Sequence, residues 1–300
     1  MRILVAGASG LIGSALLREL TAAGHSVVRL VRGPAGGADE AEWHPERGEF
    51  DAALLDGVDA VVCLNGAGVG SRRWTESYKK TLRESRLQPV GTLARAIASH
   101  GGPAVYVTAS AVGYYGDTGD RVVDEAAGPG SGFLAELCVE WESAAAPAQQ
   151  AGIRQAALRT GLVLGPGGLL GRLKPILLTG LGGPLGDGLQ YQPWISLRDE
   201  VAAIRYVLEH DDLSGPVNLT GPDPVPNREL MKALASALHR PAVVPAPAFA
   251  LRLVLGEFAD DGVLKGQRAV PAALLRAGFE FRDPTLEQAA RWALSDQARA

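Results

Sequence analysis

The sequence predicts an α/β fold, a doubly wound parallel sheet joined to a smaller carboxyl-terminal α/β lobe. Two observations carry this prediction. Short apolar runs alternate with stretches of helical periodicity over residues 1–165, and three glycines follow the first apolar run at fixed spacing. Such alternation is typical of crossover units, in which parallel strands lie side by side with helices on both faces. By length alone, 300 residues could form one large domain or two smaller ones.

The expected elements follow one another in a regular order. The strands of the first part are predicted at "RILVAG", "HSVVRLVR", "DAVVCLNGAG", "AVYVTASAVG" and "IRQAALRTGLVLG", and its helices at residues 14–23, 74–99 and 133–151. Two irregular stretches, 33–50 and 165–195, contain a weak strand at 41–43 and a helix at 169–179. From residue 198 we predict a helix, the strand "GPVNLTG", a helix at 227–238 and a last helix after Pro284.

The stretch "VAGASGLIG" spaces Gly7, Gly10 and Gly13 as G-x-x-G-x-x-G. It follows an apolar strand, opens an amphipathic helix and precedes a second strand, which is the context of a dinucleotide-binding turn. There the first glycine adopts a conformation closed to other residues, the second lets the backbone approach a pyrophosphate, and the third lets the helix sit close to the strand. The alternative is a tight turn that serves packing only. We expect a Rossmann-like cofactor turn formed by Gly7, Ser9, Gly10, Leu11, Ile12 and Gly13.

The end of the second predicted strand distinguishes the two nicotinamide cofactors. It reads "VVRLVRG", with Arg29 and Arg32 and no carboxylate before Asp39. An acidic residue there would bind the ribose 2′-hydroxyl of NAD, whereas an arginine accommodates the 2′-phosphate of NADP. We therefore predict NADP as the cofactor and Arg32 as its phosphate ligand, with a plain surface arginine as the alternative.

Composition indicates which partners to expect. The formal net charge of -4 gives no basic footprint for nucleic acid or for a membrane surface, so a small-molecule substrate is expected.

Cys63 and Cys138 lie in apolar stretches of the sequence, which is typical of buried thiols in a reducing compartment. The sequence shows no secretion signal and no apolar run of about 18 residues, so we expect a cytoplasmic protein. The five histidines lack metal-ligand spacing, which predicts no metal site. The oligomeric state stays open between a monomer and a homodimer.

Several further stretches resemble one family. On "GASGLIGSAL", "LNGAGVGSRRWTESYKK", "SRLQPVGTLARAI", "TASAVGYYGDTGD", "GFLAELCVEWE", "RTGLVLGPGG", "PWISLRDE" and "NLTGPDPVPNREL" the chain resembles the extended and atypical short-chain dehydrogenase/reductases. These form the NAD(P)-dependent sugar epimerase/dehydratase superfamily, and the chain is most similar to its sugar-nucleotide epimerase branch. The tail, at about 244–294, resembles the small domain of unknown function that ends this branch. We expect an NADP-binding Rossmann domain at 1–165 and a substrate lobe at 166–300, with the region around Asn218 crossing between them.

The resemblance implies a catalytic pair that this chain lacks. Enzymes of the superfamily use a serine and a Tyr-x-x-x-Lys pair, in which the lysine and the nicotinamide lower the tyrosine pKa for proton exchange with a substrate hydroxyl. None of the six tyrosines has a lysine four residues later. In "GFLAELCVEWE" the two positions fall on Phe133 and Leu137 or on Leu134 and Cys138, depending on the alignment. Ser110, at the end of "VYVTAS", matches the catalytic serine, with a turn or capping serine as the alternative.

Other side chains are candidates for the remaining roles. Tyr114 and Tyr115 resemble the superfamily's "YG" turn and are catalytic candidates to replace the missing acid, with a structural role as the alternative. Arg72 and Trp74 follow the "LNGAG" strand end, where ligands of doubly wound sheets bind, and suit an anion and a sugar face; an ordinary exposed loop is the alternative. The resemblance also places Asn65, Gly66 and Ala67 at the cofactor, and Gln190 and Trp194 in the substrate cleft.

Two functions fit these observations. The first is an NADP-dependent epimerase or oxidoreductase that acts on a polar substrate such as a nucleotide sugar, with Ser110 polarising the substrate oxygen and a tyrosine or water relaying the proton. The second is a non-catalytic NADP-binding sensor or interaction protein, in which the cofactor orders the loops near 66–75 and 165–195. The missing pair favours the second function, and the retained Ser110 and "SRRW" favour the first.

Overall fold

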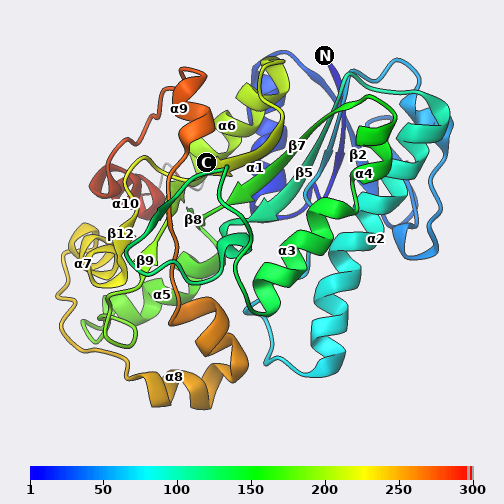
Figure 1. The fold of residues 1–300 in the computed structure, drawn as a ribbon. Helices are drawn as coiled ribbons and strands as arrows, with labels where there is room; N and C mark the ends of the chain where they lie inside the picture. Colours follow the sequence, from blue (N-terminus) through cyan, green and yellow to red (C-terminus); the bar gives the residue numbers. More distant parts are fainter. Residues whose placement is uncertain (296–297, 299–300) are drawn as a thin grey trace.

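A seven-stranded parallel sheet lies at the centre of the molecule, seen in a computed structural model that describes residues 1–295 and 298 (Figure 1). The strand order is β11-β7-β5-β4-β1-β2-β3, and each neighbouring pair is parallel. The chain starts inside the sheet, builds one half and then crosses back to build the other, which confirms the predicted doubly wound fold. The strands are β1 (Arg2–Ala6), β2 (Ser26–Val31), β3 (Glu40–Glu42), β4 (Ala60–Cys63), β5 (Val105–Ala111), β7 (Arg154–Thr160) and β11 (Gly215–Leu219).

The central strands are buried on both faces, which explains their continuous apolar sequences. All of β4 is buried, and in β1 only Arg2 is exposed. Strands that helices cover on both faces are apolar at every position rather than at alternate ones. For this reason the sequence alone was enough to recognise them.

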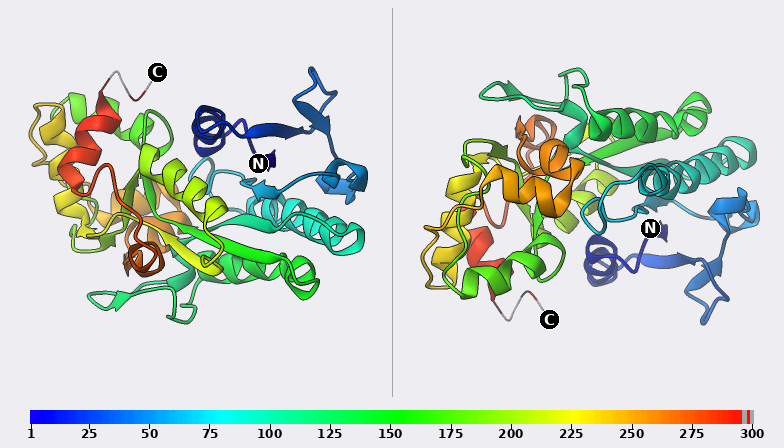
Figure 2. Two further views of the ribbon diagram at one scale, coloured as in Figure 1. Left: turned by 90° about the horizontal axis from the view of Figure 1, so that it is seen from above. Right: turned by 90° about the horizontal axis from the view of Figure 1, so that it is seen from below.

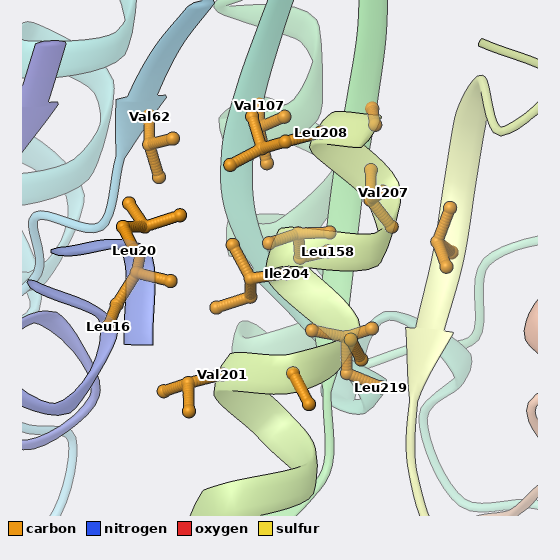
Figure 3. Packing of buried hydrophobic residues seen from close by; sticks show 14 of the residues in the cluster. Leu16, Leu20, Val62, Val107, Leu158, Val201, Ile204, Val207, Leu208 and Leu219 are labelled. Carbon is orange, nitrogen blue, oxygen red and sulfur yellow. The ribbon is translucent and has the colours of Figure 1, made fainter. Parts of the chain in front are cut away.

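Helices cover both faces of the sheet. On one face α1 (Leu11–Ala22) packs against α6 (Leu197–Glu209). On the other lie α2 (Glu76–His100), α3 (Phe133–Ser143) and α4 (Ala146–Gln150). Figure 3 shows the first layer, where α1 and α6 meet the sheet through side chains that include Leu16, Leu20, Val201, Ile204, Val62, Val107 and Leu158. Apolar residues at helical spacing give each helix one stripe that faces the sheet.

The carboxyl-terminal lobe contains three small two-stranded sheets. They pair β8 (Leu162–Leu164) with β10 (Trp194–Ser196), β9 (Tyr191–Gln192) with β12 (Val225–Pro226), and β6 (Val122–Val123) with β13 (Arg268–Ala269). Its other elements are α5 (Gly168–Leu178), α7 (Asn227–Ala237), α8 (Ala248–Leu255), the π-helical turn η4 (Ala259–Val263), α9 (Ala272–Arg276) and α10 (Leu286–Leu294). Figure 2 shows the yellow, orange and red elements of this lobe gathered at one side of the molecule.

The observed elements differ from the predicted ones at a few boundaries. α1 begins at Leu11 rather than at residue 14, because Gly10 is its N-cap. The single helix expected at 133–151 is two helices, and Pro147 lies in the first turn of the second, where a missing N–H is tolerated. The weak strand expected at 41–43 is present as β3.

The chain returns to the central sheet after residue 165. α6 packs on α1, and β11 pairs with β7. Asn218 lies on β11. The division into domains at 1–165 and 166–300 stays a prediction, and any substrate lobe would share these two elements with the sheet.

Candidate functional site

The turn between β1 and α1 requires glycine at two of its three glycine positions for packing alone. Gly7 has a φ of +82°, and a Cβ there would lie 2.7 Å from the carbonyl carbon of Leu64. A Cβ at Gly13 would overlap the carbonyl oxygen of Gly7 and lie 2.8 Å from the Cα of Ala8. Gly10 differs, because the nearest atom to a Cβ there is the Gly7 oxygen, at an ordinary 3.5 Å. Packing therefore does not explain the glycine at position 10.

The amino-terminal end of α1 has the features of an anion site. Gly10 offers no side-chain cap, and the first turn of α1 contains no acidic residue. The first N–H groups of a helix lack partners within it and carry the positive end of its dipole. Ser9 and Gly10 are exposed, so a ligand can reach this end, and Leu11 lies beside Gly167 and Gly168 at the start of α5. A dinucleotide pyrophosphate fits this arrangement.

The loop after β4 lies next to the glycine turn. A Cβ on Gly7 would be 2.9 Å from the backbone nitrogen of Asn65, so the two predicted cofactor segments meet. Helix α2 holds this loop in place: the N–H of Ala67 donates to Ser85 Oγ (3.0 Å), and the hydroxyl of Tyr78 donates to the carbonyl of Gly68 (2.6 Å).

Arg32 follows β2 directly and its side chain is exposed. Arg29 is already occupied, since its guanidinium lies 2.8 Å from Asp39 and 3.1 Å from Glu40. Arg32 has no ion-pair partner within the part of the chain that the structure describes. Of the two arginines, Arg32 is the one available to a ligand.

A buried polar network lies under the carboxyl ends of β5 and β7. Glu142, on α3, accepts hydrogen bonds from Ser110 Oγ (2.7 Å) and from Arg159 Nε (2.8 Å) and Nη2 (2.9 Å). Arg159 also donates to the hydroxyl of Tyr115 (3.0 Å), which in turn donates to Asn218 Oδ1 (2.7 Å). Burial acts to lower the pKa of Arg159, but the hydrogen bonds with Glu142 and Tyr115 outweigh it and raise the pKa above its ordinary value. The network joins α3 to three strands of the sheet.

The three hydroxyls predicted to be catalytic are placed very differently. Ser110 and Tyr115 are 3% and 1% exposed, and both of their hydroxyls donate within the network. Tyr114 is half-buried, with its ring centroid 3.4 Å from the guanidinium carbon of Arg159, and its hydroxyl has no partner among the described residues. In this geometry the hydroxyls of Ser110 and Tyr115 hold the buried network together. A catalytic role for any of the three residues stays a prediction.

The geometry favours one of the two alignments of the missing pair. A Cβ on Gly113, just after β5, would lie 3.4 Å from Leu134 Cβ and 3.9 Å from Cys138 Sγ. Leu134 and Cys138 therefore face the end of β5, with Glu142 one helical turn further on. Burial raises the pKa of Cys138 to about 11, so this thiol is uncharged at neutral pH. It does not supply the positive charge of the lysine that it replaces.

Trp74 is not available to a sugar face, in contrast to the sequence-based expectation. It is 8% exposed, its indole N–H donates to the carbonyl of Val69 (2.8 Å), and its ring centroid lies 4.9 Å from that of Phe133 and 5.3 Å from that of Phe258. Phe258 lies in the carboxyl-terminal tail and Phe133 on α3. These two segments therefore cover the indole ring that we expected to face a sugar. Arg72, on the same loop, is exposed.

The two residues expected in the substrate cleft from "QYQPWIS" are held by the protein itself. Trp194 is 1% exposed in the core of the carboxyl-terminal lobe, and its indole N–H donates to the carbonyl of Asp223 (2.8 Å). The side chain of Gln190 donates to the carbonyls of Leu185 (2.9 Å) and Val263 (3.0 Å), while its Oε1 is buried without a partner. We correct Trp194 to a core residue and describe Gln190 as a link between the loop and the tail.

Sequence reasoning assigned no site role to Glu142, Arg159 and Asn218, and it missed a buried acid on α6. Glu200 is 1% exposed; Thr160 Oγ1 donates to its Oε1 (2.9 Å), and its Oε2 has no partner. Burial raises the pKa of Glu200 to about 8 against the effect of the Thr160 hydrogen bond. Among these residues, only Glu142 had a signal in the local sequence, because positions 134, 138 and 142 are spaced to lie on one face of α3.

The described part of the chain shows neither a helix long and apolar enough to cross a membrane nor a group of three or more metal-binding side chains.

Comparisons with known proteins match two parts of the chain to known families. Residues 3–219 match the NAD dependent epimerase/dehydratase family, and residues 246–293 match a domain of unknown function, DUF1731. The chain is 51% identical to the epimerase family protein Mb2239 of Mycobacterium bovis, over 97% of each chain.

Solved structures give the same result. The crystal structure of human epimerase family protein SDR39U1 (isoform 2) with NADPH is 32% identical, with a TM-score of 0.89 over 98% of this chain and 99% of that one. UDP-N-acetylglucosamine 4-epimerase from Bacillus cereus shares the fold, with a TM-score of 0.76 at 17% identity over 97% of each chain. The chain belongs to the NAD dependent epimerase/dehydratase family, with the tail domain that the sequence resemblance indicated.

Proposed function

We propose that this chain is an NADP-dependent epimerase or oxidoreductase of the short-chain dehydrogenase/reductase type, acting on a polar substrate of the nucleotide-sugar class. The observation that carries the proposal is Gly10, a glycine that packing does not require, at an exposed and uncapped helix start. The human relative that was crystallised with NADPH supports the choice of cofactor.

Each group of residues in the cofactor site would bind a different part of the cofactor. The backbone of Gly7, Ser9, Gly10, Leu11, Ile12 and Gly13 would hold the pyrophosphate, and Asn65, Gly66 and Ala67 would flank the cofactor. Arg32 would bind the 2′-phosphate, because a guanidinium suits this anion and its neighbour Arg29 is paired. The bound nicotinamide supplies hydride transfer.

The protein residues then have to hold the substrate and move a proton. Tyr114 is the one of the three predicted hydroxyls with no partner in the described structure, so we assign it the proton exchange. Ser110 and Tyr115 keep Glu142 and Arg159 in place beneath it. Arg72 is exposed at the loop after β4 and suits an anionic group of the substrate.

A non-catalytic NADP-binding protein is the second candidate, favoured by the burial of the Ser110 hydroxyl and by the absent Tyr-x-x-x-Lys pair. Incubation of the protein with NADP⁺ and a set of nucleotide sugars would separate the two, because hydride must pass from the sugar to the oxidised nicotinamide. Appearance of an epimerised or oxidised sugar supports the enzyme, and tight cofactor binding with every sugar recovered unchanged supports the sensor.

The cofactor assignment predicts a preference that depends on Arg32. In fluorescence titrations of the cofactor-free protein, NADPH should bind more tightly than NADH, and Arg32→Asp should reduce this preference by about tenfold or more, because it replaces attraction to the 2′-phosphate with repulsion. Arg29→Gln is the matched control and should keep the preference, since Arg29 is paired with Asp39. If neither cofactor binds, or if Arg32→Asp keeps the full preference, the assignment is wrong.

A further inference from the structure

A buried arginine without a carboxylate partner lies behind the loop that follows β4. Arg86, on α2, is 8% exposed, and its guanidinium donates to the carbonyls of Leu82 (3.0 Å) and Ala67 (3.0 Å). Its guanidinium carbon also lies 4.9 Å from the ring centroid of Trp141. No Asp or Glu of the described chain is within ion-pair distance of it. Burying a cation without an anion is costly, so the burial of Arg86 calls for a ligand or a function.

The surroundings of Arg86 contain few charges. Burial lowers the pKa of Arg86, and Cys138 and Tyr78 are the titratable groups that act against this shift. An arginine nevertheless stays protonated in proteins. The positive charge of Arg86 is therefore present at neutral pH, and no negatively charged side chain of the described residues pairs with it.

The guanidinium lies between the loop that follows β4 and helix α3. On one side is the loop of Asn65, Gly66 and Ala67, since a Cβ on Gly66 would be 3.2 Å from the guanidinium carbon. On the other side is α3, because the guanidinium carbon lies 4.9 Å from the ring centroid of Trp141, which follows Cys138 by about one helical turn. Cys138 takes the lysine position in the alignment that the geometry favours. A cation is thus missing from α3 and present on α2, against the same turn of α3.

We propose that Arg86 supplies the positive charge at the nicotinamide end of the cofactor site, in place of the lysine that the chain lacks. This assignment rests on the proposed NADP-binding function. It has a consequence for cofactor binding, because the nicotinamide ring is positively charged in NADP⁺ and neutral in NADPH. A fixed cation nearby repels the oxidised ring only, so the protein should bind NADPH more tightly than NADP⁺.

The neighbouring Arg83 is a suitable control. It lies on the same helix, but its guanidinium pairs with Glu140 of α3 (3.0 Å) and its side chain is 35% exposed. Its removal takes away an arginine of the same helix without touching the cofactor loop. Arg86→Lys is the second control, because it keeps the charge while changing the hydrogen bonds.

The test is the ratio of the dissociation constants of NADP⁺ and NADPH, measured by calorimetry on the full chain. In the wild-type protein NADPH should bind more tightly. Arg86→Met should reduce this preference by about tenfold, whereas Arg86→Lys and Arg83→Met should keep most of it.

Other results would overturn the proposal. If Arg86→Met weakens NADP⁺ and NADPH equally or leaves the ratio unchanged, Arg86 acts on the phosphates or on folding and not on the nicotinamide. If Arg86→Met does not fold, the wild-type and Arg86→Lys ratios decide, and a wild-type ratio at or below one contradicts the proposal. Failure of the wild-type chain to bind either form would instead contradict the proposed function, so the two failures are distinguishable.

Discussion

Glu142→Ala is expected to lower the free energy of unfolding by about 3–5 kcal/mol. The substitution removes the carboxylate that accepts two hydrogen bonds from Arg159 and one from Ser110. Arg159 is 3% exposed and would keep its charge in the protein interior without an anion. Urea denaturation of the wild-type and variant chains measures the loss.

Glu140→Ala is the matched control, because Glu140 lies on the same helix and pairs with Arg83 at the surface. Exposed pairs contribute about 0–1 kcal/mol, so this variant should lose little. The double variant Glu142→Leu with Arg159→Met removes both charges and should recover much of the stability if the loss comes from the unpaired cation. Equal losses for Glu142→Ala and Glu140→Ala would show that the network contributes no more than a surface pair.

Glu200→Gln is expected to stabilise the protein at alkaline pH and to flatten the pH dependence of its stability. The pKa of Glu200 is raised from 4.5 to about 8 by burial, so between these values the folded state holds a proton that the unfolded state releases. Stability therefore falls as the pH rises through this window, and the full penalty remains above pH 8. Each pKa unit corresponds to about 1.4 kcal/mol, and glutamine removes the penalty because it has no charge to bury.

Thermal or urea unfolding between pH 5 and pH 9 measures this effect. The advantage of the variant should grow with pH and disappear near pH 5, where the wild-type carboxyl is protonated in the folded state. Glu229→Gln removes an exposed carboxylate of α7 that forms no ion pair among the described residues, and it should follow the wild-type curve within about 1 kcal/mol. A Glu200→Gln curve parallel to that of the wild type would mean that Glu200 is not a raised carboxyl.

The parts of the fold that the sequence predicted depend on local patterns. Buried parallel strands are apolar at every position, and the glycine turn places its three glycines within one short segment, so both are visible in neighbouring residues. The same holds for Arg32, which follows its strand directly. These features sufficed for the fold and the family resemblance, and the prediction of the cofactor turn rests on them.

The remaining features depend on residues that only the fold brings together. The ring of Trp74 does not face a cleft as predicted, because Phe258 of the carboxyl-terminal tail packs against it. The hydroxyl of Ser110 is not free, because it donates to Glu142 of α3, a residue 32 positions away in the chain. A charge on one face of an amphipathic helix gives no sign of whether it pairs in the core or at the surface.

The affinity of Gly10→Ala for NADPH, measured together with its melting temperature without cofactor, shows whether the turn between β1 and α1 holds the cofactor. The added Cβ meets only ordinary contacts at 3.5 Å, so the melting temperature should stay within about 2 °C of the wild type. It stands where the pyrophosphate approaches the backbone, so the affinity for NADPH should fall by about tenfold or more. Unchanged NADPH affinity in a folded Gly10→Ala protein would contradict the claim that this turn holds the cofactor.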